Sequence, residues 1–366
     1  MDDFVFDLDN LYNLKMYEDY IDFLFSKIND NADNLLAEKL RKARSKSSFA
    51  RKPGPGIADV YGYIIPADIA VESLADIPVQ ISIVTNPSIN LSSEGFALLY
   101  LRLASIGSEF SKTFIALSKA PLEKLKGRIR LKARPILYCI APYESIEDPR
   151  ASIADENELY FVKALYRSPR SSVFTFKLLM ENDKPITVEA LHFVDERGDR
   201  FLLRDFRDTF PLTNRFMVVR PYLRNYRIGG IFIGPFEGSS IHIQELEAIP
   251  ELQPTMGEEK TGGNASTRLS SNEFLLLYHC VDSHGIYYTY AALFDDNAEL
   301  LALTEEPVIA PRPEVYSGRR PGTVFACGAV KVGGDILVTA GKDDEITIVY
   351  KIVEEELFEK LKFLKG

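Results

Sequence analysis

Residues 323–353 read TVFACGAVKVGGDILVTAGKDDEITIVYKIV, and this stretch shows the pattern that recurs along most of the chain. It contains three short runs, TVFACGAV, DILVTAG and EITIVYKIV, which are rich in β-branched residues. Gly and Asp residues, which favour turns, separate the three runs. The stretch therefore predicts three consecutive strands joined by tight turns, with no helix between them.

Similar runs fill the chain from residue 80 onward. Many consecutive strands without intervening helices indicate an all-β fold, in a sandwich, a barrel or a propeller. Several pairs of runs recur at intervals of roughly 40–60 residues, which suits the blades of a propeller. The other predicted strands are QISIVTNPSI (80–89), FALLYLRLA (96–104), KTFIALSK (112–119), RPILYCIA (134–141), ELYFVKALY (158–166), VFTFKLLM (173–180), RFMVVRPY (215–222), GGIFIGPF (229–236), FLLLYHCV (274–281) and YYTYAALF (287–294).

Both ends of the chain show helical periodicity instead. Apolar residues recur at helical spacing through residues 11–46, and Asp33 or Asn34 is well placed to cap a second helix. The Pro and Gly residues of SSFARKPGPG (47–56) predict a loop. The final residues, EEELFEKLKFLKG, predict a closing helix at about 354–364.

These patterns divide the chain into two parts. Residues 1–56 are predicted to be a helical N-terminal extension and loop, and residues 57–366 a β-domain that ends in the C-terminal helix. The amphipathic N-terminal helices pack either on the rim of this domain or on another subunit, which would make the protein a homo-oligomer.

Composition narrows the class of protein. The chain has 366 residues, of which 46% are hydrophobic and 26% charged, so it can build a substantial core. Its formal net charge of −10 argues against generic binding to nucleic acid or an anionic membrane, because such binding needs a basic face. The N-terminus lacks a signal-peptide pattern, and no apolar run could span a bilayer. We therefore expect a cytoplasmic protein without nucleic-acid or membrane partners.

The residue types that ligate metals are sparse. Cys139, Cys280 and Cys327 are too few and too far apart for a disulfide framework or a zinc site. The four histidines show no ligand pattern such as HExxH. We therefore expect no metal and no cofactor.

SIEDPRAS (145–152) places two acids, a proline and an arginine between two apolar runs. An Asp before Pro is biased away from helical dihedral angles, and proline has a fixed φ. The segment is therefore expected to be a stiff extended or turn connection that holds the carboxylate of Asp148 in one pose. On this interpretation Asp148 faces a cleft, and Arg150 orients it or contacts a substrate. The alternative is a surface turn with a local Glu–Arg pair.

Basic residues accompany the apolar runs in the second half of the chain. Arg207 precedes one strand and Arg220 ends it, while Lys260 precedes a Gly-Gly turn and His279 ends another strand. Arginine offers a planar fork to phosphate, lysine a compact charge, and histidine a donor that titrates near neutrality. Each could be an ordinary surface charge. Arg220 and His279, however, end strongly hydrophobic strands, where a polar side chain needs a partner.

These motifs, in this order, resemble those of glycoside hydrolase family 130, the mannoside phosphorylases and related mannosidases built on five-bladed β-propellers. The resemblance runs through most of residues 80–350. It implies an all-β, five-bladed β-propeller with an N-terminal helical extension and a short C-terminal helix. Its motifs are TNPSI (85–89), LLYLRLA (98–104), FIALSK (114–119), SIEDPRAS, RDTFPLTNRFMVVRP (207–221), KTGGNASTRLSSNEFLLLYH (260–279) and VFACGAV (324–330).

The resemblance also implies a reaction. A single carboxylic acid, here Asp148, would protonate the glycosidic oxygen of a β-mannoside or similar β-linked oligosaccharide, through a sugar hydroxyl. Inorganic phosphate, the co-substrate, would attack the anomeric carbon from the opposite face with inversion and form a sugar 1-phosphate. Phosphate is already an anionic nucleophile, so it needs positioning and charge neutralisation rather than a base.

By position, the resemblance assigns roles to further residues. The phosphate-binding cations match Arg207, Arg220, Lys260 and His279, with Arg204 as a substitute for Arg207. The substrate-binding residues match Asn86, Arg102, Glu147, Arg150 and Tyr278. The chain departs from the family at Phe274, where a Trp is usual; because the chain has no Trp, Tyr and Phe would have to stack on sugars.

Two other functions fit the same sequence. An inverting β-mannoside hydrolase of the same family would use Glu147 or a later Glu as the base that activates water. A non-catalytic propeller would bind a carbohydrate or a protein partner. The retained set of two arginines, a lysine and a histidine favours the phosphorylase over the hydrolase, because the resemblance implies that hydrolases of the family tend to lose it.

Overall fold

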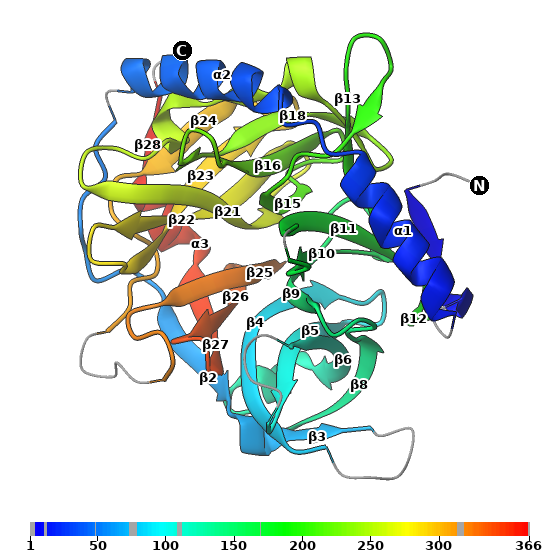
Figure 1. Cartoon of the computed structure of the whole chain (residues 1–366). Coiled ribbons are helices and arrows are strands. Elements are labelled where there is room, and N and C mark those ends of the chain that lie inside the picture. The colour runs from blue at the N-terminus through cyan, green and yellow to red at the C-terminus, as the bar shows by residue number, and fades with distance from the viewer. Residues whose placement is uncertain are drawn as a thin grey trace.

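The computed structural model describes residues 4–10, 13–47, 49–72, 79–107, 112–168, 170–312 and 318–364. Within these residues, the strands form five sheets that surround a common centre (Figure 1). The prediction of an all-β, propeller-like fold is therefore confirmed. Among the described helices, none has both the length and the apolar character needed to cross a membrane.

Sheets 1 and 2 begin at the centre and run outward through neighbouring strands. Sheet 1 contains, from the centre outward, β4 (Ile81–Leu91), β5 (Phe96–Ser105), β6 (Phe114–Pro121), β8 (Leu131–Leu137) and β3 (Ile69–Val71). Sheet 2 contains β9 (Glu144–Ala151), β10 (Glu158–Leu165), β11 (Ser172–Glu181), β12 (Lys184–Ala190) and β1 (Val5–Asp7). In both sheets the outermost strand comes from an earlier part of the chain than the rest.

The other three sheets follow the same plan. Sheet 3 contains β15 (Phe206–Pro211), β16 (Phe216–Leu223), β18 (Phe232–Glu237), β19 (Ser240–His242), β13 (His192–Val194) and β14 (Arg200–Phe201), with β17 (Ile228–Gly229) on β16 and β20 (Glu247–Ala248) on β18. Sheet 4 contains β21 (Glu258–Arg268), β22 (Glu273–Asp282), β23 (Tyr287–Asp295), β24 (Leu300–Thr304) and β28 (Leu361–Phe363). Sheet 5 contains β25 (Val324–Val332), β26 (Asp335–Lys342), β27 (Ile346–Val353), β2 (Asp59–Ile64) and β7 (Gly127–Arg128).

The middle strands are buried along nearly their whole length, and mostly apolar, because neighbouring sheets cover both of their faces. In β22, every residue from 274 to 281 is buried, and in β10 every residue from 159 to 165. Strands buried on both faces read as continuous apolar runs and do not alternate. The sequence therefore predicts these strands well, but it does not predict which way each side chain faces.

Segments that are distant in sequence close the ring of sheets. β4 contacts both β9 and β25, and β21 contacts both β15 and β25. β2, which precedes sheet 1, pairs antiparallel with β27 near the end of the chain, with Val60 opposite Tyr350. β28 likewise returns to pair with β24 at the outer edge of sheet 4. The innermost strands are thus held around one centre from both ends of the chain.

The innermost strand of every sheet carries a β-bulge, where one extra residue interrupts the pairing with its neighbour. The bulges contain Asn86, Asp148, Asp208, Asn264 and Cys327. Asn86, Asp148 and Asp208 have φ angles of 44°, 50° and 51°. Asn and Asp tolerate this left-handed region better than most residues. Since a bulge re-aims the side chain that it carries, these strands can present polar groups at the centre.

SIEDPRAS is the innermost strand of sheet 2, not the connection between two strands that the sequence predicts. Proline lacks an N–H and is therefore confined to bulges and edges within sheets. β9 provides both conditions, because it is an edge strand and Pro149 lies in its bulge. The segment is extended, as expected, but it lies at the centre of the ring of sheets and not on a surface turn.

The helices lie outside the ring of sheets. α1 (Leu14–Ser26) packs on sheet 2 through Tyr17 and Phe25, and α2 (Ala32–Lys46) contacts β16 and β20 of sheet 3 (Figure 1). They thus pack on the rim of their own chain, and a homo-oligomer through them stays a prediction. α3 (Glu354–Lys360) is shorter than predicted, because Leu361 begins β28. Short 3₁₀ helices are η1 (Leu8–Asn10), η2 (Pro66–Asp68), η3 (Leu122–Leu125), η4 (Ile243–Glu245) and η5 (Pro250–Leu252).

A buried polar cluster joins α1 to the innermost strand of sheet 2. The Tyr17 hydroxyl donates to Glu144 Oε2 at the start of β9. Lys163 Nζ on β10 donates to the Tyr17 oxygen at 2.6 Å and lies 3.4 Å from Glu144 Oε2. Glu144 Oε1 also accepts the backbone N–H groups of Ile140 and Ala141. All three side chains are buried, so each depends on the other two for its polar partners.

We expect Lys163→Met to destabilise the fold strongly. The substitution leaves the Glu144 carboxylate buried without its cation, and removing one partner of a buried ion pair costs about 3–5 kcal/mol of unfolding free energy. Urea denaturation followed by circular dichroism measures the change. Lys15→Met removes an exposed ion pair with Asp19 on α1 and should leave the urea midpoint unchanged. Equal midpoints for Lys163→Met and the wild type would contradict the expectation.

Candidate active site

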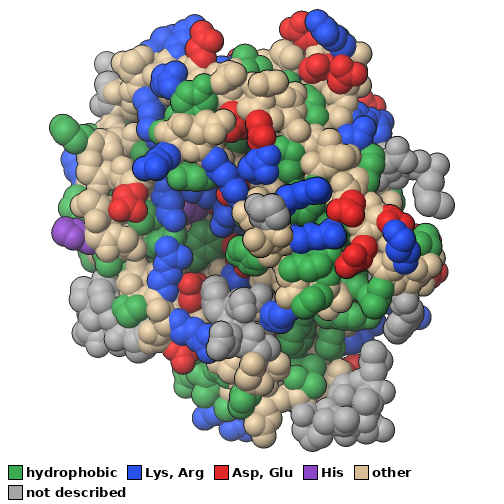
Figure 2. Space-filling view, viewed as in Figure 1, with side chains coloured by type: hydrophobic (Ala, Val, Ile, Leu, Met, Phe, Trp, Pro, Cys, Tyr) green, Lys and Arg blue, Asp and Glu red, His purple; other side chains and the backbone are tan. Residues whose placement is uncertain are grey.

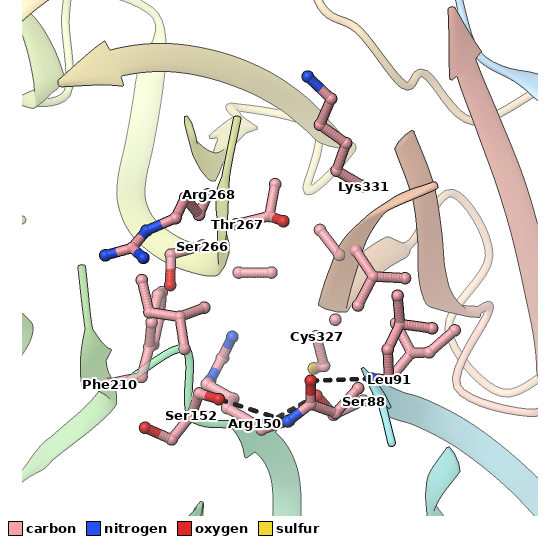
Figure 3. A pocket seen from close by; sticks show the side chains of 18 residues that line it. Ser88, Leu91, Arg150, Ser152, Phe210, Ser266, Thr267, Arg268, Cys327 and Lys331 are labelled. Atoms are coloured by element: carbon pink, nitrogen blue, oxygen red, sulfur yellow. Dashed lines mark hydrogen bonds between the residues drawn. The ribbon is translucent and has the colours of Figure 1, made fainter. Parts of the chain in front are cut away.

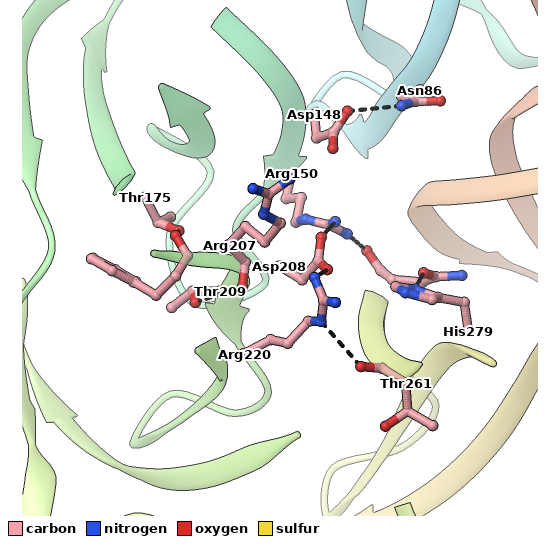
Figure 4. A network of polar contacts seen from close by, with 12 residues as sticks. Asn86, Asp148, Arg150, Thr175, Arg207, Asp208, Thr209, Arg220, Thr261 and His279 are labelled. Atoms are coloured by element: carbon pink, nitrogen blue, oxygen red, sulfur yellow. Dashed lines mark hydrogen bonds and ion pairs between the residues drawn. The ribbon is translucent and has the colours of Figure 1, made fainter. Parts of the chain in front are cut away.

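A cavity of about 130 Å³ opens at the centre of the ring of sheets. In Figure 4, Asp148 and Asn86 lie apart from Arg220 and His279, with Asp208 between them. The acidic and basic residues that line the cavity are Arg102, Glu147, Asp148, Arg207, Asp208, Arg220, Lys260, His279, Arg320 and Asp344. The other lining residues are Asn86, Tyr287, Thr323 and Phe325. The structure therefore brings together residues from all five sheets around one small, highly charged space.

Asp148 is held through one of its two carboxylate oxygens. Arg102 Nη1 on β5 donates to Asp148 Oδ1 at 2.8 Å, and Asn86 Nδ2 in the β4 bulge donates to the same oxygen at 2.7 Å. The other oxygen, Oδ2, has no hydrogen-bond partner within the described ranges. Because Asp148 lines the cavity and its side chain is 14% exposed, Oδ2 is free to contact a ligand.

Arg150 does not contact Asp148, although the sequence suggests that it orients that carboxylate or contacts a substrate. Arg150 Nη2 donates to Asp208 Oδ1 at 2.5 Å, and Nη1 donates to the backbone carbonyl of Asn264. The side chain is buried and does not line the cavity. Arg102, which lies on a different sheet, makes the contact expected of Arg150.

Asp208 lies between two guanidinium groups. Its Oδ1 accepts from Arg150, and its Oδ2 accepts from Arg220 Nη1 at 3.2 Å. Arg220 Nε also donates to the carbonyl of Thr261 at 3.1 Å. A Cβ on Gly262 would lie only 2.8 Å from Arg220 Cδ and 2.9 Å from Asp208 Oδ2. The predicted Gly-Gly turn is instead part of β21, where glycine leaves room for this ion pair.

Lys260 lies in the same cavity without a carboxylate partner among the described residues. Its Nζ is 5.2 Å from the centre of the Tyr287 ring. Burial, and then the positive charges of Arg220 and Arg320, lower the pKa of Lys260 to about 8. A bound anion would oppose these charges and favour the protonated lysine.

His279 is fixed by the Asn264 side chain. His279 Nδ1 lies 2.7 Å from Asn264 Oδ1, while Asn264 Nδ2 donates to Thr289 Oγ1 at 3.2 Å. Because an amide oxygen can only accept, Nδ1 carries the proton and Nε2 of the neutral ring does not. Burial lowers the pKa of His279 well below its ordinary value, and the charge of Arg220 lowers it further. The imidazole is therefore neutral in the empty cavity.

Of the two other predicted cations, Arg207 and Arg204, only one lines the cavity. Arg207 lines the cavity, and its Nη2 lies 3.3 Å from Asp205 Oδ1. Arg204, the predicted substitute for Arg207, lies away from the cavity and pairs with Asp30 at 2.7 Å. The structure thus brings Arg207, not Arg204, to the other cavity cations.

Only one of the two residues Glu147 and Tyr278, both predicted to bind substrate, lines the cavity. Glu147 lines the cavity, and its Oε1 lies 3.4 Å from Arg102 Nη2. Tyr278 does not line the cavity; it is fully buried, and the guanidinium of Arg51 lies 5.8 Å from its ring centre. Because Tyr278 and His279 are neighbours on β22, they face opposite sides of the strand.

Several residues that line the cavity were not predicted from the sequence, among them Asp208, Tyr287, Arg320 and Asp344. Asp344 comes from the hairpin between β26 and β27, where Asp343 and Asp344 have φ angles of 53° and 54°, as in type I′ turns. Burial raises the pKa of Asp344, an effect that the charge of Arg102 opposes. The Asp-Asp pair in GKDDE indicates a turn, but nothing in the sequence indicates that this turn borders the cavity.

A second cavity, of about 210 Å³, lies along the other halves of the innermost strands (Figure 3). It shares no lining residue with the charged cavity. Ser88, Ser152 and Ser266 give it hydroxyl groups, and Arg150 and Cys327 line its floor between the two spaces. The bulges therefore mark the boundary between a charged cavity and a less charged one.

Known proteins resemble this chain over most of its length. The family model described as beta-1,4-mannooligosaccharide phosphorylase matches residues 62–363. The beta-1,2-mannobiose phosphorylase of Thermoanaerobacter sp. (strain X514) is 36% identical over 235 residues, which cover 63% of this chain and 73% of that protein.

Two solved structures share the fold. A beta-1,2-mannobiose phosphorylase from Listeria innocua, in complex with beta-1,2-mannobiose, has a TM-score of 0.60 at 17% identity and covers 86% of this chain and 99% of its own. A mannose phosphorylase from Leishmania mexicana, in complex with a phosphate ion, has a TM-score of 0.52 at 16% identity and covers 84% of this chain and 92% of its own. At these identities the likeness concerns the fold alone.

We expect Lys260→Met to stabilise the fold at pH 7. Burial lowers the pKa of Lys260 from 10.5 to about 8 in the folded protein, so below pH 8 the folded state carries a poorly solvated charge. Between pH 8 and 10.5 the unfolded state binds more protons than the folded state, so this cost fades as pH rises. The gain in urea midpoint should therefore be largest at pH 7 and vanish near pH 10.5.

Lys42→Met is the control for this comparison, because Lys42 is exposed on α2 and far from the cavity. The Lys42→Met substitution should leave the urea midpoint unchanged at pH 7 and at pH 10.5. A Lys260→Met variant that is less stable than the wild type at pH 7 would mean that the lysine charge is stabilised by the protein, contrary to the expectation.

Proposed function

The chain belongs to glycoside hydrolase family 130, and we propose that it is an inverting phosphorylase that cleaves a β-mannoside with inorganic phosphate. The observation that supports the proposal is the division of the charged cavity. The acid Asp148 and the pair Arg220 and His279 all line this cavity, and Figure 4 shows the acid apart from that pair, with Asp208 between them. We also propose that the five sheets are the five blades of a propeller, because each contributes its innermost strand to the centre.

In the proposed reaction, Asp148 protonates the leaving oxygen of the glycosidic bond. Arg102 and Asn86 occupy Oδ1, so Oδ2 carries the proton. The proton passes to the bridging oxygen, directly or through a sugar hydroxyl, as the bond from that oxygen to the anomeric carbon breaks. A general acid must be held within reach of the oxygen that it protonates, and the bulge with its two hydrogen bonds holds Asp148 in one orientation.

Phosphate is the nucleophile in this proposal. It lies among Arg220, Lys260 and His279, whose unprotonated Nε2 accepts from the P–OH group of hydrogenphosphate, and one of its other oxygens forms a bond to the anomeric carbon on the face opposite the leaving group. The product is a sugar 1-phosphate of inverted configuration. Arg220 is positioned in advance by Asp208 and the Thr261 carbonyl, so it need not reorganise during the reaction.

β-1,2-Mannobiose is the first substrate to test, because the relative at 36% identity is a beta-1,2-mannobiose phosphorylase. The family model is described by β-1,4-linked mannooligosaccharides, so that linkage is the second. Tyr287 and Phe325 line the cavity and supply aromatic rings for a sugar in a chain without Trp.

Inverting hydrolysis is the alternative reaction for the same cavity. It needs a second carboxylate that activates water on the face of the sugar opposite the acid. Glu147, the predicted base, is adjacent to Asp148 on β9 and pairs with Arg102, which also holds Asp148. This position on the side of the acid favours phosphate over water as the nucleophile.

We expect the wild type to release mannose 1-phosphate from β-1,2-mannobiose only when phosphate is present. Asp148→Asn should lower the rate of phosphorolysis by about 10²–10⁴-fold, the usual contribution of a general acid, because the amide cannot donate the catalytic proton. It should bind phosphate as well as the wild type does. Anion-exchange chromatography of the products and calorimetric titration with phosphate measure the two effects.

Glu147→Gln distinguishes the alternatives. If the protein is a phosphorylase, this variant keeps far more activity than Asp148→Asn. Release of free mannose without phosphate, lost in Glu147→Gln, would instead show a hydrolase. No turnover of either the β-1,2- or the β-1,4-linked substrate would favour a non-catalytic binding role.

A further inference from the structure

Arg320 lies at the mouth of the charged cavity, on a loop that none of the sequence motifs includes. The residue is exposed and lines the cavity. Its guanidinium carbon is 5.1 Å from the centre of the Tyr287 ring, and Lys260 Nζ is 5.2 Å from the same point. Two cations, one from β21 and one from the loop before β25, thus lie beside one aromatic ring and border the same space.

The backbone of the loop holds Arg320 in this position. The Arg320 N–H donates to the carbonyl of Asp343 at 3.1 Å, and the Asp343 carboxylate accepts the N–H of Gly322 at 3.0 Å. The Tyr287 N–H donates to the carbonyl of Gly322 at 3.1 Å. Gly322 has a φ of 81°, which glycine adopts without steric cost. The loop is therefore tied both to β23 and to the hairpin between β26 and β27.

Positive charge at this end of the cavity is balanced only in part by the protein, because Asp208 and Asp344 line the cavity but form no ion pair with Lys260 or Arg320 among the described residues. Arg220 and Arg207 each pair with an aspartate, whereas neither Lys260 nor Arg320 makes an ion pair with an acid in the described part of the chain. Lys and Arg side chains also gather around the central hollow in Figure 2, although the whole chain has a net charge of −10. Two unpaired positive charges match the two negative charges of hydrogenphosphate.

We infer that Arg320 is a phosphate-binding residue, which together with Lys260 neutralises the phosphate dianion as it enters the cavity. The inference rests on the proposed function and adds a residue to the predicted set of Arg207, Arg220, Lys260 and His279. The planar guanidinium donates to phosphate oxygens from the mouth, while Lys260 contacts the anion from the buried side. Because Arg320 is exposed, it is the first of these cations that phosphate meets, so it also speeds association.

Arg319 provides a matched control for this inference. It is the preceding residue, it is exposed and it carries the same charge, but it does not line the cavity. Replacing either arginine by glutamine changes the net charge by the same amount. A difference between the two variants therefore reports on contact within the cavity and not on the overall field of the protein.

The test is calorimetric titration of the full-length protein with inorganic phosphate. Arg320→Gln should weaken binding by about fivefold, the upper end for an exposed ion pair, and should reduce the dependence of affinity on ionic strength. Arg320→Lys should recover part of the loss, because it keeps the charge and loses the planar fork. Arg319→Gln should bind as the wild type does. In steady-state phosphorolysis, Arg320→Gln should raise the KM for phosphate more than it lowers kcat.

The pH profile of phosphate affinity gives a second readout. In the wild type, affinity should fall as pH rises through about 8, where Lys260 loses its proton. Because the charge of Arg320 lowers the pKa of Lys260, Arg320→Gln should move this fall to higher pH. A residue that only supports the loop would not move it in this direction.

The possible failures can be told apart. If the wild type binds phosphate and Arg320→Gln binds it equally well with an unchanged pH profile, the inference is overturned and the proposed phosphorylase stands. If Arg319→Gln and Arg320→Gln lose the same affinity, the effect is one of net charge and the inference is likewise overturned. If the wild type binds no phosphate and cleaves mannobiose without it, the proposed function fails, and the inference with it.

Discussion

One carboxylate shared by two guanidinium groups holds the centre of this protein together. Asp208 on β15 accepts from Arg150 on β9 and from Arg220 on β16, and Arg150 also reaches the carbonyl of Asn264 on β21. Three sheets are joined in this way by charge-assisted hydrogen bonds. Removal of Asp208 would leave two buried guanidinium groups without their anion, which proteins tolerate poorly. Arg220, one of the cavity cations, is therefore placed by the same contacts that join the sheets.

The bulges let a single strand serve both this network and the cavity. In a regular strand, residues two apart point to the same face, so Asp148 and Arg150 would lie side by side. The bulge on β9 changes that alternation. The acid reaches the cavity, while the arginine enters the buried network with Asp208. The same change occurs at the equivalent place in every sheet, which is why the charged cavity lies at one end of the innermost strands and the second cavity at the other.

Much of this arrangement could be predicted from the sequence, because strands and turns depend on local composition. The resemblance also grouped Arg220, Lys260 and His279, which the structure brings to one cavity. The partner of Asp148 could not be predicted, because Arg102 reaches it from another sheet and no local pattern encodes that contact. The direction in which side chains face on strands buried on both sides could not be predicted either. Tyr278 was therefore expected to bind substrate, although only its neighbour His279 lines the cavity. Arg320 and Asp344 lie on turns, and turn residues carry no sign of what they face.

The pairing of β2 with β27 has a consequence for how the protein is made. The ribosome synthesises β2 almost 300 residues before β27, so sheet 5 cannot be completed until residue 353 has emerged. Phe325 and the hairpin that carries Asp344 arrive in the same late stretch. The nascent chain therefore has no finished cavity while translation proceeds. A prematurely terminated product has an open ring with exposed strand edges, which makes it a target for chaperones and proteases and leaves it without a usable site.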